Sequence, residues 1–176
     1  DLRKLRMLPG VDRTERVKGP SIIALGEFLT TRTMREGDVF ITNDPWKGTG
    51  HLHDITMVSP SFKGDRLVGF FACTAHVVDV GGRGFGADGK SVYEEGIQIP
   101  ILKYQREGVV NQDLIDIIAM NVRLAERALG DLRAQITAIT TGERRYVELL
   151  QRYGAEAVNA SIRQIMDSSE AVARKN

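Results

Sequence analysis

All three histidines of the chain fall between positions 44 and 79, and three of the aspartates in this stretch lie close to them in sequence or at its ends. The six residues are Asp44, His51, His53, Asp54, His76 and Asp79. Neutral imidazole binds zinc, iron, nickel or manganese, and a carboxylate adds a hard oxygen ligand. A metal ion with an open coordination position would polarise a carbonyl group or activate a water molecule. The residue types in this stretch therefore indicate a metal site or an acid–base site.

A β-hairpin would bring the two ends of this stretch together. The segments HDITMVSPSF and RLVGFFACTAHVVDV are rich in β-branched and aromatic residues, and the KGD between them is typical of a turn. Because the two arms have comparable lengths, His76 is expected to return beside His51 and Asp54. His51 and His53 would share a face if the chain is already extended there. His51 and Asp54 converge only if the chain turns, which Thr49-Gly50 allows.

The same residues have simpler explanations. Histidines in a loop can be solvated surface residues, and one histidine near an apolar strand can be a hydrogen-bonded core residue. Spacing alone leaves these explanations open beside the metal and acid–base sites.

Two parts of different character surround the cluster. Residues 1–110 are rich in glycine and short β-type runs, whereas residues 111–176 contain few helix breakers and read as helical, in a hairpin or small bundle. We treat both parts as pieces of one larger domain. PSIIALGEFLTTRTM (20–34) predicts a helix, and GDVFITN (37–43) predicts a strand. The predicted fold is α+β, with a mixed or antiparallel sheet followed by helices.

The segment SVYEEGIQIPILKY (91–104) is predicted to be extended, because Pro100 argues against a helix. Glu94 and Glu95 would then face opposite sides of the chain and would not act as a pair. Solvated or salt-bridging side chains are the simpler explanation, and one of the two lining the site is the alternative. Asn111 is a suitable cap for the helix that follows.

The composition argues against several other functions. A net charge of +1 and 6% aromatic residues give no basis for nucleic-acid binding or for attachment to a membrane surface. No apolar run is long enough to span a bilayer. The single cysteine, Cys73, indicates a reducing, cytoplasmic setting, and its apolar neighbours predict a packed core thiol.

A glycine-rich stretch after the histidines, GGRGFGADGKS (81–91), matches the phosphate-binding pattern G-x-x-x-x-G-K-[ST]. The matching residues are Gly84, Gly89, Lys90 and Ser91. This pattern binds a nucleotide when it joins a strand to a helix whose N-terminus holds the phosphates. Gly96 and Pro100 interrupt the next segment, so no helix is expected for about twenty residues. A flexible connection is therefore favoured, and a P-loop nucleotide-binding domain over 84–91 remains an alternative.

Long motifs in this chain resemble the hydantoinase B/oxoprolinase family, which includes the large subunits of N-methylhydantoinase and of acetone and acetophenone carboxylases. The motifs are GDVFITNDPWKGTGHLHDITMVSPSFKGDRLVGFFACTAHVVDVGG, SVYEEGIQIP and NVRLAERALGDLRAQITAITTGERRYVELLQRYG. They occur in the family's order and cover roughly residues 37–154. Val77 stands where many members have a second histidine, and His53 where proline is common. Because family subunits are much longer, the chain is expected to be a fragment.

The resemblance implies a subunit of an ATP-dependent enzyme that hydrolyses hydantoin-like or lactam rings. A metal-containing subunit of an acetone- or acetophenone-type carboxylase is the alternative within the family. The ATP would be bound by a partner subunit of the hydantoinase A type, so the resemblance implies a hetero-oligomer. A fragment that has lost activity and only scaffolds a partner through its helices is a third possibility.

The resemblance also assigns roles to individual residues. The family's metal-binding motif, which holds manganese or zinc, falls on His51, Asp54 and His76. Asp44 of the NDP motif, Asp79 of the DVGG motif and the additional His53 are the candidate catalytic residues.

Overall fold

The computed structural model describes residues 34–47, 50–84, 86 and 88–175. The strands are β1 (Val39–Thr42), β2 (Asp54–Lys63), β3 (Arg66–His76), β4 (Leu102–Arg106) and β5 (Val109–Val110). The helices are α2 (Val92–Glu95), α3 (Gln112–Asn121), α4 (Ala125–Tyr153) and α5 (Ala155–Ala173). The helix predicted over 20–34 lies outside the described residues, except for Met34 at its end.

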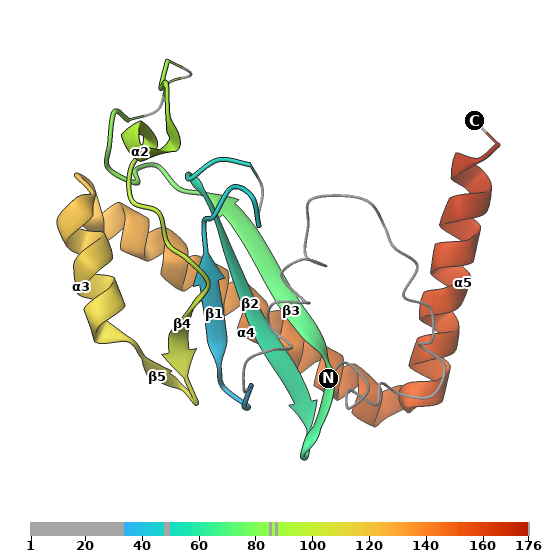
Figure 1. The fold of residues 1–176 in the computed structure, drawn as a ribbon. Coiled ribbons are helices and arrows are strands. Elements are labelled where there is room, and N and C mark those ends of the chain that lie inside the picture. The colour runs from blue at the N-terminus through green and yellow to red at the C-terminus, as the bar shows by residue number, and fades with distance from the viewer. Residues whose placement is uncertain (1–33, 48–49, 85, 87, 176) are drawn as a thin grey trace.

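The strands form one five-stranded sheet in the order β3-β2-β1-β4-β5, and every neighbouring pair is antiparallel. The predicted α+β class is confirmed: the sheet lies in the first part of the chain and three helices follow (Figure 1). The predicted strand at 37–43 and the predicted hairpin are also present as β1, β2 and β3. Strand β3 ends at His76, so the DVGG motif lies beyond the sheet.

The long helix α4 lies against one face of the sheet, where it contacts β2 and β3, and α3 packs beside it (Figure 1). The main core between them takes side chains from both parts of the chain. Its fully buried members include Ile41 and Met57 of the sheet and Leu132 and Ile139 of α4. The predicted helical second part is confirmed, and α3 packs beside α4. The apolar stripe of α4 also packs on the sheet, a contact that the predicted helical hairpin or small bundle did not include.

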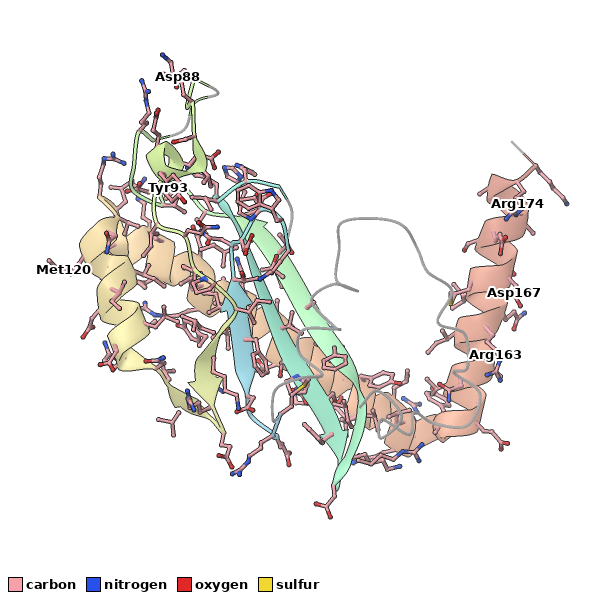
Figure 2. All side chains as sticks on the ribbon, viewed as in Figure 1. Asp88, Tyr93, Met120, Arg163, Asp167 and Arg174 are labelled. Atoms are coloured by element: carbon pink, nitrogen blue, oxygen red, sulfur yellow. The ribbon has the colours of Figure 1, made fainter. Side chains whose placement is uncertain are left out.

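Helix α5 leaves this layered body after the α4–α5 junction, where it contacts α4, as Figure 1 shows. Figure 2 shows Arg163 and Asp167 on the side of α5 that faces away from the sheet. Ile165 and Met166 are both 65% exposed. Among the described residues, no helix is long and apolar enough to cross a membrane.

Two short elements differ from the sequence-based prediction. The segment predicted to be extended over 91–104 begins with a helical turn, α2, and reaches extended structure only afterwards, at β4. The segment between β4 and the cap residue Asn111 contains β5, which pairs with β4 across a turn in which Glu107 and Gly108 both have positive φ. The predicted cap is present, since Asn111 Oδ1 accepts a hydrogen bond from Leu114 N at 3.3 Å. Cys73 is partly buried and packs against the main core, as predicted.

Candidate metal centre

Asp54 and His76 come together because the hairpin closes in register. Asp54 is the first residue of β2, His76 is the last residue of β3, and the two are direct partners in the antiparallel ladder. His51 lies in the loop that enters β2, and the backbone N–H of Asp54 donates to the His51 carbonyl at 3.2 Å. This turn, which was one of the two backbone conformations left open by the sequence, places the His51 side chain beside Asp54.

One carboxylate oxygen lies between the two imidazoles. Asp54 Oδ1 is 3.0 Å from His51 Nε2 and 3.0 Å from His76 Nδ1. One ligand atom from each of the three residues lies within 4.8 Å of the other two. Ligand atoms that each stand at about 2.0–2.2 Å from one ion are themselves roughly 3 Å apart. Two imidazole nitrogens and a carboxylate oxygen at this spacing therefore fit a divalent ion such as zinc or manganese.

The third histidine stacks on this group from the protein side. The His53 ring centroid lies 5.3 Å from that of His76, with 12° between the ring planes, and 5.6 Å from that of His51. His53 is only 3% exposed, and its carbonyl accepts a hydrogen bond from Val77 N at 2.8 Å. Burial lowers the pKa of His53, and the neighbouring His76 and His51 lower it further, against the opposing charges of Glu95 and Asp79. The ring is therefore favoured in its neutral form.

The two remaining aspartates contact backbone groups outside this cluster. Asp44 Oδ1 accepts a hydrogen bond from Trp46 N at 3.0 Å and so forms a local turn after β1. Asp79 Oδ1 accepts from Gly81 N at 2.9 Å, and Asp79 Oδ2 accepts from the backbone N–H groups of Arg123 and Leu124. The guanidinium of Arg123 also donates to Asp79 Oδ1 at 3.0 Å. Asp79 thereby joins the end of the hairpin to the start of α4.

Burial alone raises the pKa of the Asp79 carboxyl. The three backbone N–H donors and the charge of Arg123 outweigh this effect, so the pKa is lowered. Asp79 is thus held as a carboxylate in a buried position.

Two further polar residues hold the backbone between the histidines. The sequence assigned no role to Asn43, and it offered Glu94 or Glu95 only as an alternative residue that lines the site. Asn43 Nδ2 donates to the Leu52 carbonyl at 2.8 Å, and Glu95 Oε2 accepts from Leu52 N at 3.2 Å. The position of Asn43 immediately after a buried strand was the only signal in the sequence. The role of Glu95 depends on α2, which lies in a segment that was predicted to be extended.

The glycine-rich stretch runs from the end of the hairpin to α2, and Figure 2 shows Asp88 at its tip and Tyr93 on α2. The expectation that no helix follows this stretch was wrong, since α2 begins immediately after Ser91. However, α2 has only four residues and ends at Gly96. The carboxylate of Glu94 already accepts hydrogen bonds from Lys90 N at 3.3 Å and from Arg83 at 2.7 Å. An internal carboxylate thus takes up a backbone amide that a bound phosphate would need.

Comparisons with known proteins agree with the sequence motifs. The profile of the Hydantoinase B/oxoprolinase family matches residues 20–176. The B component of a putative D-/L-hydantoinase from Pseudomonas sp. (strain NS671) is 36% identical over 183 residues, which cover 99% of this chain and 31% of the relative.

Two solved structures share the fold. The ATP-dependent caprolactamase from Pseudomonas jessenii has a TM-score of 0.79 at 34% identity, and the match covers 89% of this chain and 28% of that chain. The nucleotide-free structure of an acetone carboxylase has a TM-score of 0.68 at 24% identity, covering 75% of this chain and 18% of that one, which establishes a common fold. The chain spans less than a third of the length of these relatives.

The cluster of two histidines and an aspartate lies at one end of the sheet. The profile match over most of the chain and the similarity to the hydantoinase relative show that this chain belongs to the hydantoinase B/oxoprolinase family.

Proposed function

We propose that this chain forms part of a subunit of an ATP-dependent enzyme that hydrolyses cyclic amides, and that it binds one divalent metal ion. The ligands would be His51, Asp54 and His76, and the ion would be manganese or zinc. The observation that carries the proposal is the position of Asp54 Oδ1 at 3.0 Å from a nitrogen of each histidine. The names of the relatives support the reaction class, because hydantoin and caprolactam are both cyclic amides.

When bound, the metal would polarise the amide carbonyl of the substrate or the water that attacks it. The protein's contribution is to hold its ligands in place at the end of a rigid hairpin. His53 is the candidate for moving a proton, because its imidazole stacks on both ligand histidines.

We propose that ATP is bound by a separate subunit of the hydantoinase A type and not by this chain. Two observations support this division. The glycine-rich stretch is followed by a single helical turn, and its Lys90 amide is engaged by Glu94. The need for ATP itself is supported by the caprolactamase that shares the fold, which is an ATP-dependent enzyme. A cytoplasmic location is part of the same proposal and is supported by the lone, unpaired cysteine.

The direct test replaces His51 with alanine in the complete enzyme complex. Bound manganese and zinc are measured by elemental analysis, and ATP-dependent hydrolysis is measured with a hydantoin and with a lactam. The variant is expected to lose most of its bound metal, and its turnover is expected to fall at least 100-fold. A fall of this size is expected because a Lewis acid stabilises the transition state by roughly several kcal/mol. Asp65→Asn, in the exposed turn at the opposite end of the hairpin, is the control and is expected to keep both. Unchanged metal content and turnover in His51→Ala would refute the proposal.

A further inference from the structure

Leu52 lies between His51 and His53, and a side chain from another segment binds each of its two backbone polar groups, the N–H and the carbonyl. Its N–H donates to Glu95 Oε2 at 3.2 Å, and its carbonyl accepts from Asn43 Nδ2 at 2.8 Å. The Leu52 side chain is fully buried in the main core. The backbone between the two histidines is thus fixed at three points, two of which are polar side chains from other segments.

Asn43 provides the rigid side of this arrangement. Its Nδ2 also donates to the Ile97 carbonyl at 2.9 Å, and its Oδ1 accepts from Ile99 N at 2.6 Å. Asn43 is 1% exposed, so these hydrogen bonds lie in a buried, low-dielectric environment that strengthens them. One side-chain amide therefore connects the end of β1, the histidine loop and the segment before β4.

Glu95 approaches Leu52 from the other side, and its own position is set by the chain after β3. Glu95 ends α2, and the next two residues lie against Val80, where Ile97 N donates to the Val80 carbonyl at 2.8 Å. Gly96 has a φ of 139°, and a Cβ at this position would overlap the Val80 carbonyl oxygen. The backbone that carries Glu95 therefore fits only one way against the segment that follows His76.

We propose that Glu95 and Asn43 are positioning residues, which hold His51 in its metal-binding geometry, and His53 beside it, through the backbone of Leu52. This inference rests on the proposed metal site. Among the described residues, the group with metal-ligand spacing comprises His51, Asp54 and His76, so Glu95 acts through Leu52 rather than as a ligand. Groups that orient metal ligands typically change metal affinity 10- to 100-fold when they are removed.

The hydrogen bond and the charge of Glu95 can be separated by substitution. The amide side chain in Glu95→Gln would still present an oxygen that accepts from Leu52 N, whereas the methyl group in Glu95→Ala would not. Glu94 offers a matched control, because it lies in the same helical turn but pairs with Arg83. Asn43→Asp would lose both donors of the side chain. Because that loss is buried and can also unfold the chain, the Glu95 variants decide the question.

The experiment titrates the full chain with Mn²⁺ alone and with Zn²⁺ alone, in competition with a chelator. Glu95→Ala is expected to weaken metal binding by about 10-fold or more. Glu95→Gln and Glu94→Ala are expected to stay within about twofold of the unmodified chain. The proposal is overturned if Glu95→Ala binds as tightly as the unmodified chain, or if Glu95→Gln is weakened as much as Glu95→Ala.

A second readout does not require metal. The chain has three histidines, so their ring signals can be followed individually by NMR in the absence of metal. Glu95→Ala is expected to shift or broaden the signals of His51 and His53, and Glu94→Ala is not. If the unmodified chain binds no metal, the proposed function fails and these signals alone test the positioning role. Unchanged signals in Glu95→Ala would then overturn it.

Discussion

Asp54 and His76 face each other as the terminal pair of the β2–β3 ladder, and Asp54 Oδ1 lies 3.0 Å from His76 Nδ1. Two segments that are distant in sequence therefore meet at a point fixed by backbone register. A slip of one residue would turn the His76 side chain to the other face of the sheet. The hairpin thus defines the geometry of the candidate metal centre before any ion binds.

Asp79 is expected to stabilise the fold by joining the hairpin to α4. In Asp79→Asn, an amide nitrogen or a neutral oxygen would replace the carboxylate that accepts from Gly81, Arg123 and Leu124. Buried donors would be left poorly satisfied, and the free energy of unfolding should fall by about 2–3 kcal/mol. Urea denaturation measures this change. Asp116→Asn, on the exposed face of α3, is the control, and an equal loss in both variants would contradict the role of Asp79.

The same residue predicts a pH dependence of stability. Because the pKa of Asp79 is lower in the folded chain than its ordinary value of 3.8, the unfolded chain binds more protons in acid. The stabilisation by Asp79 should be fully present above that ordinary value and should be lost as the pH falls through the lowered pKa. Unfolding curves recorded between neutral and acidic pH should therefore converge for the unmodified chain and Asp79→Asn. A constant difference between the two chains at all pH values would refute the prediction.

Gly81 should tolerate no side chain. Its φ is +83°, and a Cβ would overlap the Asn121 carbonyl oxygen between α3 and α4. Gly81→Ala is expected to lower the free energy of unfolding by roughly 1–3 kcal/mol or more. Gly130→Ala is the matched control, since Gly130 lies within α4 with nothing within 4 Å of the added Cβ. That variant should gain about 0.5–1 kcal/mol from helix propensity. Thermal unfolding of both variants tests the pair, and equal effects of the same sign would contradict it.

Lys90 is expected to be dispensable for nucleotide binding. In a P-loop the lysine contacts the β- and γ-phosphates, so its loss would abolish binding. Here the Lys90 side chain is exposed and its backbone amide is engaged by Glu94. Titration of the enzyme complex with a labelled ATP analogue should therefore give the same affinity for Lys90→Ala and the unmodified protein. A large loss of affinity would instead support the P-loop alternative.

The hairpin was predictable because its signals are local. β-type residues on both sides of a KGD turn specify β2 and β3, and comparable arm lengths place His76 opposite Asp54. The glycine before His51 allows the turn between His51 and Asp54 but does not require it. These features need no information about the rest of the fold.

The parts that were missed depend on contacts between distant segments. Asp79 contacts Arg123, which lies 44 positions further along the chain. Asn43 contacts Ile99, which lies 56 positions further along. No periodicity or spacing in the sequence reports such pairs. The packing of α4 on the sheet was missed for the same reason, since an apolar helix face does not reveal its partner. The turn α2 was missed because a single helical turn is too short to show a helical repeat.

The most direct test of the metal centre is competitive titration of the full chain with Mn²⁺ and Zn²⁺, comparing Asp54→Asn with Asp65→Asn. The amide in Asp54→Asn keeps the side-chain volume but removes the negative charge between the two imidazoles. We predict that the unmodified chain and Asp65→Asn each bind one ion. For Asp54→Asn we predict that the metal affinity falls by more than about 100-fold, which is a larger fall than the removal of a group that only orients a ligand would cause. Equal binding by the two variants, or no binding by the unmodified chain, would contradict the metal centre.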